Sequence, residues 1–261
     1  MKKKVIIVTG ASSGMGRELS RIIAKRYKVD AEFWLIARRR ERLIELSGEL
    51  SALGKGSRIL DMDLLSETAF ERLSLLLKEE EPKVMLLINA SGFGKLGRFS
   101  DMDPSETEDM IRLNCCALSR VCRLCLPYMA RGYGHIINFA SAAAFSPMPH
   151  FAVYGATKAY VLSFSRALNE ELKPVGVSVT AVCPGPVRTE FFDIAEEHES
   201  VPLYKRFFMA DARRVAKKAL KDSLCSKPVS TYGLSIGALR VLTKVLPVSV
   251  VLYVMSKLSS R

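Results

Sequence analysis

Short apolar segments rich in β-branched residues alternate with longer segments of helical periodicity over most of the chain. We expect six strands, at residues 4–9, 31–37, 58–62, 84–88, 133–140 and 177–183. We expect helices around them, at residues 17–27, 43–53, 67–78, 104–131, 151–173 and 211–224. This alternation predicts an α/β fold built on a doubly wound parallel sheet, with helices on both faces and therefore three layers. The chain has no internal repeat and no low-complexity linker, so we expect a single domain over residues 1–261.

The hydrophobic pattern changes in the last part of the chain. Residues 227–261 contain no acidic residue and five basic ones, and two apolar helices are predicted there, at 234–246 and 248–258, separated by Pro247. These apolar runs are too short or too interrupted to span a bilayer. The tail can lie on an anionic membrane surface, or it can pack on the domain or on a partner subunit.

Composition and charge narrow the range of functions. The chain has 49% hydrophobic and 25% charged residues, which is ordinary for a globular protein. The formal net charge of +12 favours anionic partners, but no nucleic-acid-binding motif accompanies it, so we expect no nucleic-acid partner. The three histidines are scattered along the chain without metal-ligand spacing, and we expect no metal site.

The six cysteines are interpreted as free thiols. Four of them, Cys115, Cys116, Cys122 and Cys125, fall in one predicted helix, where we expect them to act as small core hydrophobes. Cys122 and Cys125 have the spacing of half a zinc site, but no second pair completes it. Free thiols predict a reducing, cytoplasmic compartment, with membrane association through the tail left open.

A glycine-rich segment, TGASSGMG at residues 9–16, lies between the first strand and the first helix. Strand, glycine turn and helix form the context in which such a loop binds a phosphate group. Gly10, Gly14 and Gly16 let the backbone turn sharply and approach the anion, and Ser12 and Ser13 add hydroxyl groups. A plain turn between strand and helix is the alternative.

The second predicted strand ends in three arginines rather than in an acid. In a doubly wound sheet, an acid at this position holds the ribose 2′-hydroxyl of NAD, whereas arginine accommodates the 2′-phosphate of NADP. Arg38 and Arg39 therefore favour NADP(H), while Arg40 is expected to face solvent at the start of the next helix. Asp63, after the third strand, is placed to accept from an adenine amino group or to cap a helix.

Three side chains suggest acid–base chemistry. Tyr154 and Lys158 are about one helical turn apart, so they share a helix face. A nearby ammonium group favours the phenolate and lowers the pKa of the tyrosine toward neutrality. Ser141 ends an apolar strand, where its hydroxyl can hold a substrate oxygen beside the tyrosine. Asn114 lies within an apolar helix and is expected either to brace the Lys158 region or a water molecule, or to face solvent.

Together, these residues resemble the short-chain dehydrogenases/reductases, in their compact, NADP-preferring, bacterial form with a Rossmann-type fold. The matching stretches are TGASSGMG at 9–16, Asp63, NASG at 89–92, Asn114, Ser141, YGATK at 154–158 and PGPVRT at 184–189. They occur in the order and with the spacings of that family, over about residues 4–190. NASG replaces the family's usual N-N-A-G or N-A-G.

The resemblance implies a catalytic tetrad of Asn114, Ser141, Tyr154 and Lys158. Tyr154 would be the general acid/base and Ser141 would orient the substrate oxygen. Lys158 would hold the nicotinamide ribose and lower the pKa of the tyrosine, and Asn114 would keep a water molecule for proton relay. The cofactor contacts that it implies are Gly10, Ser12, Ser13, Gly14, Met15, Gly16, Arg38, Arg39, Asp63, Leu64, Asn89, Ala90, Ser91, Tyr154, Lys158, Pro184, Gly185, Val187 and Thr189.

The implied function is hydride transfer between NADP(H) and a small-molecule carbonyl or secondary alcohol, with an apolar substrate such as a ketoacyl or steroid-like ketone. The alternative is a catalytically silent, nucleotide-binding redox sensor on the same fold, although the intact tetrad argues against it.

The resemblance also implies a division of the chain. Residues 1–190 would be the cofactor-binding and catalytic core, residues 190–226 a substrate lid and residues 227–261 the tail. The apolar lid side chains suit an apolar substrate but can equally pack on the core; they are Phe191, Phe192, Phe207, Phe208 and Met209. A homodimer or homotetramer would form through the predicted helices 104–131 and 151–173.

Overall fold

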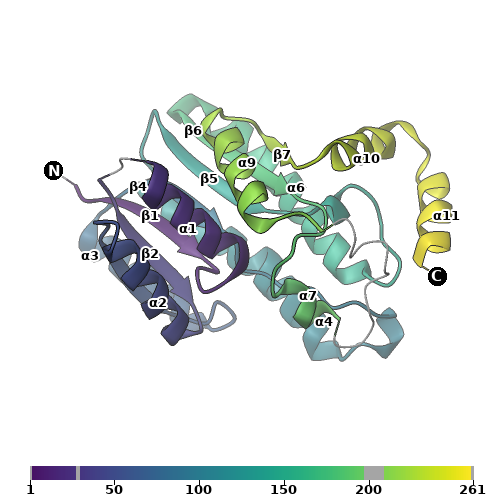
Figure 1. Ribbon diagram of the computed structural model, residues 1–261, viewed down its shortest axis with the longest axis horizontal. Coiled ribbons are helices and arrows are strands. Elements are labelled where there is room, and N and C mark those ends of the chain that lie inside the picture. Colours follow the sequence, from purple (N-terminus) through teal and green to yellow (C-terminus); the bar gives the residue numbers. More distant parts are fainter. Residues whose placement is uncertain (1, 28–29, 197–208, 260–261) are drawn as a thin grey trace.

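Within residues 2–27, 30–196 and 209–259, which the computed structural model describes, seven strands form one parallel sheet in the order β3-β2-β1-β4-β5-β6-β7 (Figure 1). The strands are β1 Lys4–Thr9, β2 Glu32–Ala37, β3 Ser57–Asp61, β4 Lys83–Asn89, β5 Gly134–Phe139, β6 Val177–Cys183 and β7 Val229–Thr231. The helices are α1 Gly14–Arg26, α2 Arg40–Ser51, α3 Glu67–Glu80, α4 Pro104–Ile111, α5 Leu118–Cys125, α6 Ala152–Leu172, α7 Phe191–Ala195, α9 Ala212–Leu224, α10 Leu234–Val245 and α11 Val248–Ser259.

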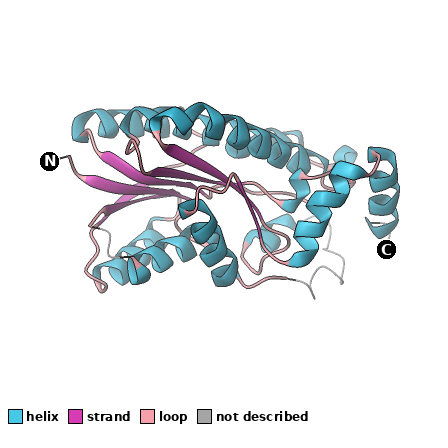
Figure 2. Ribbon diagram, turned by 90° about the horizontal axis from the view of Figure 1, so that it is seen from above, coloured by secondary structure: helices cyan, strands magenta, loops and turns pink. Residues whose placement is uncertain are grey.

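Helices cover both faces of the sheet, as Figure 2 shows from above. Helices α3, α5 and α6 pack on one face, and α1, α2 and α9 pack on the other. The alternation of side chains along a strand supplies both cores. In β2, Trp34 and Ile36 join the first core, while Phe33 and Leu35 join the second. The predicted three-layer, doubly wound α/β fold is therefore confirmed.

The strand order reverses direction between β1 and β4, because the chain first adds β2 and β3 on one side of β1 and then β4 on the other. At such a switch point the connections leave the sheet in opposite directions and a crevice opens outside the carboxyl ends of the strands, where ligands bind. The glycine-rich segment follows β1, and Asn89 ends β4 at the same edge. The topology thus brings the predicted motifs to one edge of the sheet.

The six predicted strands are confirmed, and a seventh, β7, was not predicted. β7 has three residues and pairs in parallel with β6. A segment of that length is too short to show a periodicity.

The predicted helix over residues 104–131 is divided and ends early. Helix α4 runs into a π-helical segment, Arg112–Ala117, before α5. The chain becomes extended at Met129, which forms a parallel bridge to Val84 of β4, so the helix cannot reach residue 131. Cys115, Cys122 and Cys125 are buried as predicted. Cys116 is exposed, so the prediction that it is a small core hydrophobe is wrong.

The tail forms the two predicted helices, α10 and α11, which project beyond the sheet and its flanking helices (Figure 1, yellow). Helix α10 contains no buried residue, and Leu234 is 95% exposed. No helix in the described part of the chain is long and apolar enough to cross a membrane.

Candidate active site

A cavity of about 590 Å³ lies at the switch point. Its lining combines the glycine-rich loop after β1 with the residues that follow β2, β3, β4, β5 and β6. Most of the site residues predicted from the sequence line it: Gly10, Ser12, Ser13, Gly14, Met15, Arg38, Arg39, Asp63, Leu64, Ala90, Ser91, Ser141, Tyr154, Lys158, Pro184, Gly185, Val187 and Thr189. Gly16, Asn89 and Asn114 do not line it, and their roles are different.

The glycine-rich loop is held in a conformation that needs glycine. Gly10 has φ of +67°, and a Cβ on it would lie 2.6 Å from the carbonyl oxygen of Ala90. A Cβ on Gly16 would lie 2.5 Å from the carbonyl oxygen of Gly10, so Gly16 closes the loop against itself instead of facing the cavity. Because α1 begins at Gly14, its N-terminal amides lie beside the cavity, as a phosphate site requires.

The arginines after β2 divide into separate roles. Arg38 and Arg39 are exposed side chains on the cavity wall, and Arg39 Nη2 donates to Ser12 Oγ at 3.2 Å and to Ser13 Oγ at 2.8 Å. Arg39 therefore joins the end of β2 to the glycine-rich loop. Arg40 pairs with Asp61 at 3.2 Å and does not line the cavity, in agreement with its expected place at the start of α2.

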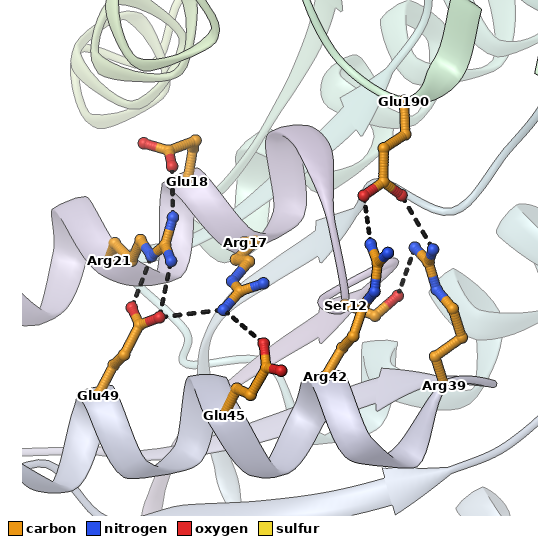
Figure 3. Close-up of polar contacts among 9 residues, drawn as sticks. All are labelled: Ser12, Arg17, Glu18, Arg21, Arg39, Arg42, Glu45, Glu49 and Glu190. Atoms are coloured by element: carbon orange, nitrogen blue, oxygen red, sulfur yellow. Dashed lines mark hydrogen bonds and ion pairs between the residues drawn. The ribbon is translucent and has the colours of Figure 1, made fainter. Parts of the chain in front are cut away.

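Glu190 is a site residue that the sequence analysis missed. Its carboxylate pairs with Arg39 at 2.9 Å and also with Arg42, which lies in the first turn of α2 (Figure 3). Glu190 is about 150 positions from both arginines in the chain. No local pattern marks such a pairing, and an acid directly after the PGPVRT stretch was the available signal.

Ser141, Tyr154 and Lys158 meet at the other end of the cavity. The Ser141 hydroxyl lies beside the Tyr154 phenol, and Ser141 Oγ accepts from the backbone N–H of Ala143 at 3.1 Å. Lys158 Nζ donates to the carbonyl oxygen of Phe139 at 2.8 Å and lies 5.5 Å from the centre of the Tyr154 ring. A strand end and a helix thus place a hydroxyl, a phenol and an ammonium group around one space.

The pKa of Tyr154 is shifted in the direction opposite to the expectation. Burial raises the pKa of this phenol to about 12, and the neighbouring Ser141 hydroxyl opposes the shift without reversing it. The Lys158 ammonium group bonds to the Phe139 carbonyl oxygen rather than to the phenol. Burial also lowers the pKa of Lys158 to about 8, so most of this side chain stays protonated at neutral pH.

Asn114 braces the site from behind. Its side chain is fully buried in the π-helical segment, where Nδ2 donates to the Phe93 carbonyl oxygen at 2.8 Å and to Thr157 Oγ1 at 3.1 Å. Its Oδ1 accepts from the Phe93 N–H at 3.1 Å. A Cβ on Gly92 would meet Asn114 Oδ1 at 2.7 Å and Lys158 Nζ at 3.4 Å, so both side chains lie beside Gly92. The solvent-facing alternative is wrong.

Asn89 and Asp63 form side-chain hydrogen bonds within the protein. Asn89 is buried beneath the cavity, where Nδ2 donates to Asn138 Oδ1 at 2.9 Å and to Cys122 Sγ at 3.2 Å. Asn138 is its register partner in β5, so the two side chains lie next to each other on the sheet. Asp63 is exposed on the cavity wall and accepts from the Leu65 N–H at 3.0 Å, while Ser66 occupies the capping position of α3.

The half of the cavity beyond Tyr154 is apolar, and the sequence analysis anticipated it only in part. Phe151 stacks on Tyr154 with ring centres 4.2 Å apart, and Phe191 lies 5.3 Å from the same ring. Phe191 and Phe192 line the cavity, Met209 does not, and Phe207 and Phe208 lie outside the described residues. Ile236 and Leu239 of α10 complete the wall. Their periodicity predicted a helix but gave no sign that it covers the site.

The glycines after β4 keep this half open. A Cβ on Gly94 would lie 2.6 Å from Tyr154 Cδ2 and 3.0 Å from the ring of Phe151. Any side chain there would displace the tyrosine. The second glycine of the GFG stretch at 92–94 was the signal that could have identified this position from the sequence.

Comparison with known proteins gives consistent matches. The family model for short chain dehydrogenase matches residues 4–200. The chain is 37% identical over 199 residues to the NADP-dependent 3-hydroxy acid dehydrogenase YdfG of Escherichia coli strain K12, covering 73% of this chain and 75% of that protein. A short-chain dehydrogenase from Sphingobium yanoikuyae in complex with NADPH aligns with a TM-score of 0.77 at 29% identity, over 94% of this chain and 96% of that chain. The bulky-bulky ketone specific alcohol dehydrogenase from Comamonas testosteroni aligns with a TM-score of 0.73 at 25% identity, over 94% and 95% of the chains.

Proposed function

The chain belongs to the short-chain dehydrogenase/reductase family of oxidoreductases, and we propose that it transfers a hydride between NADP(H) and an apolar carbonyl or secondary alcohol. The observation that carries this proposal is the joint position of Ser141, Tyr154 and Lys158 in the same cavity as the glycine-rich loop. A dinucleotide that reached from Gly10 to Tyr154 would lie across the switch point, where doubly wound sheets bind such cofactors.

In the proposed reaction the cofactor carries the hydride, and side chains of the protein transfer the proton. The bound nicotinamide supplies or accepts the hydride. In reduction, the Tyr154 phenol gives its proton to the carbonyl oxygen, while the Ser141 hydroxyl donates a hydrogen bond to the same oxygen. In oxidation, the tyrosine takes the proton back. Lys158, mostly protonated at neutral pH, stabilises the phenolate left after proton donation, and Asn114 fixes the wall beside it.

The raised pKa of Tyr154 is compatible with the reductive direction. A carbonyl is reduced by a neutral phenol that can donate a proton, and burial keeps the phenol neutral in the free protein. The oxidative direction needs the phenolate, which burial disfavours.

The preference for NADP(H) over NAD(H) is supported by the charge at the end of β2. Arg38 and Arg39 line the cavity there, and guanidinium groups suit a 2′-phosphate. The name of the E. coli relative and the NADPH complex of the Sphingobium protein point the same way. An apolar substrate is supported by Phe151, Phe191 and Leu239 on the cavity wall. A ketone substrate is supported by the bulky ketones for which the Comamonas enzyme is specific.

The proposal also covers membrane contact, cellular compartment and oligomeric state. The exposed apolar side chains of α10 and α11, with Lys244 and without an acid, support peripheral contact with an anionic membrane. All six cysteines are free, which supports a reducing, cytoplasmic compartment. Ile111 and Tyr160 are exposed on α4 and α6, in the region proposed for a homodimer or homotetramer, and light scattering in solution would test that assembly.

The catalytically silent sensor finds no support in the comparisons, and one variant separates it from the enzyme. Tyr154→Phe keeps the ring and its packing on Phe151 but removes the proton donor. We expect NADPH-dependent turnover of a panel of apolar ketones and ketoacyl thioesters to fall by roughly 10²–10⁴-fold in this variant. NADPH should still raise its thermal unfolding temperature as in the wild type. Equal turnover in both proteins, or none in the wild type, would count against the enzyme.

A further inference from the structure

The carboxylate of Glu190 lies where two arginines converge, next to the phosphate-binding loop (Figure 3). Arg39 contacts Ser12, Ser13 and Glu190 at the same time, and Arg42 reaches Glu190 from the first turn of α2. Glu190 and Arg39 both line the cavity, and Arg42 does not. The pairing therefore forms one edge of the site rather than a remote surface contact.

Two guanidinium groups around one anion form a site that suits phosphate at least as well as carboxylate, because phosphate offers more oxygens and more charge. Partial burial opposes ionisation of Glu190, but hydrogen bonds from Arg42 and Arg39 outweigh this effect and lower the pKa of the carboxyl. The carboxylate is thus charged at neutral pH and neutralises cations that a 2′-phosphate would otherwise attract.

Arg38 provides a contrast at the same edge. It lines the cavity, and no ion pair joins it to an acid among residues 2–27, 30–196 and 209–259. One cation at this edge is therefore open to an incoming phosphate, while Arg39 and Arg42 are already engaged.

We propose that Glu190 is an internal anion that competes with the cofactor 2′-phosphate for Arg39 and Arg42, and thereby limits the preference for NADPH over NADH. This inference rests on the proposed function, because it assumes that the cavity binds a nicotinamide dinucleotide. NADH carries no 2′-phosphate, so it can bind without breaking the Glu190 pairs. NADPH gains the arginines only by displacing the carboxylate.

The test is a fluorescence titration of NADPH and NADH against the wild type, Glu190→Gln and Glu190→Ala. Both variants remove the competing charge, and the two differ in size, so an effect shared by both reports charge rather than shape. We expect both to bind NADPH roughly three- to tenfold more tightly than the wild type, as expected for two partly exposed ion pairs. Affinity for NADH should stay within about twofold, since its binding leaves those pairs intact.

Glu45→Gln is the matched control. Glu45 lies on the same helix as Arg42, pairs with Arg17 at 3.1 Å and does not line the cavity (Figure 3). It should leave both affinities unchanged, which separates a local effect of Glu190 from a change in overall charge.

The outcomes distinguish this inference from the function on which it rests. If the wild type binds neither dinucleotide, the proposed function and this inference both fail. If the wild type binds NADPH but the two Glu190 variants bind it equally or more weakly, only the inference is overturned. Weaker binding would mean that Glu190 positions the arginines for phosphate instead of competing for them.

Discussion

At the scale of single residues, burial dominates the chemistry of the site. It raises the pKa of Tyr154 to about 12 and lowers the pKa of Lys158 to about 8, so both shifts favour the neutral side chain. The Tyr-x-x-x-Lys spacing alone suggests a lysine that lowers the pKa of its tyrosine. The sequence could place the two groups on one helix face, but it could not show that the Phe139 carbonyl oxygen holds the ammonium group.

The Lys158 shift leads to a prediction about stability and pH. The unfolded chain binds a proton at Lys158 up to its ordinary pKa of 10.5, whereas the folded protein releases it near pH 8. Stability should therefore rise as the pH increases from about 8 toward 10.5, and this contribution should be lost as the pH falls through 8. Its full size is on the order of 3 kcal/mol.

The measurement compares the free energy of unfolding of the wild type and Lys158→Met by urea denaturation, at pH values near 8 and near 10.5. Loss of the bond to Phe139 gives an offset that is independent of pH, so the change in the difference between the proteins isolates the titration. We expect the wild type to gain relative to the variant at the higher pH. A difference that stays constant would show that Lys158 is not desolvated in this way.

At the scale of elements, the periodicity of the chain predicted much of the architecture. Six strands and the main helices follow from it, because each buries an apolar face or stripe that the sequence displays. The features that were not predicted depend on contacts between distant segments. They are the π-helical segment around Asn114, the short strand β7 and the return of α10 to the cavity.

Helix α10 contributes to the site through one face only, and this can be tested. Leu239 lines the cavity, whereas Val241 on the same helix is 61% exposed. In Leu239→Ala, we expect KM for a bulky apolar ketone to rise by roughly three- to tenfold, because apolar surface in contact with the substrate is lost. The dissociation constant of NADPH should not change.

Val241→Ala is the control, since it shortens an apolar side chain outside the cavity and should leave KM unaltered. Steady-state kinetics at saturating NADPH would measure both variants. If KM were the same in the two variants and the wild type, α10 would have no part in substrate binding.

At the scale of the whole molecule, the sheet brings distant motifs to one edge, and the end of the tail, helix α11, extends beyond it (Figure 1). The motifs meet at one edge because the strands are parallel, and the alternation of strands and helices in the sequence predicted this topology. The function of the tail cannot be deduced from the topology of the sheet. Exposed Val245 and Val248, near the basic Lys244, leave an apolar and basic surface at one end of the molecule.

This surface leads to a prediction about membranes. We expect the wild type to float with vesicles that contain anionic lipid at low salt, and to remain behind with purely zwitterionic vesicles or at high salt. A variant with Val241→Ser, Val245→Ser and Lys244→Gln should float less, since both the apolar and the basic parts are reduced. Failure of the wild type to float with anionic vesicles would exclude this use of the tail.

The most direct test of the proposed function is the binding of the cofactor itself. NADPH and NADH would be titrated by fluorescence against the wild type, the double variant Arg38→Ala/Arg39→Ala, and Arg40→Ala as a control outside the cavity. We expect the wild type to prefer NADPH, and the double variant to lose roughly 10–100-fold in NADPH affinity while binding NADH as before. Arg40→Ala should behave as the wild type. A preference for NADH in the wild type, or no binding of either dinucleotide, would contradict the account.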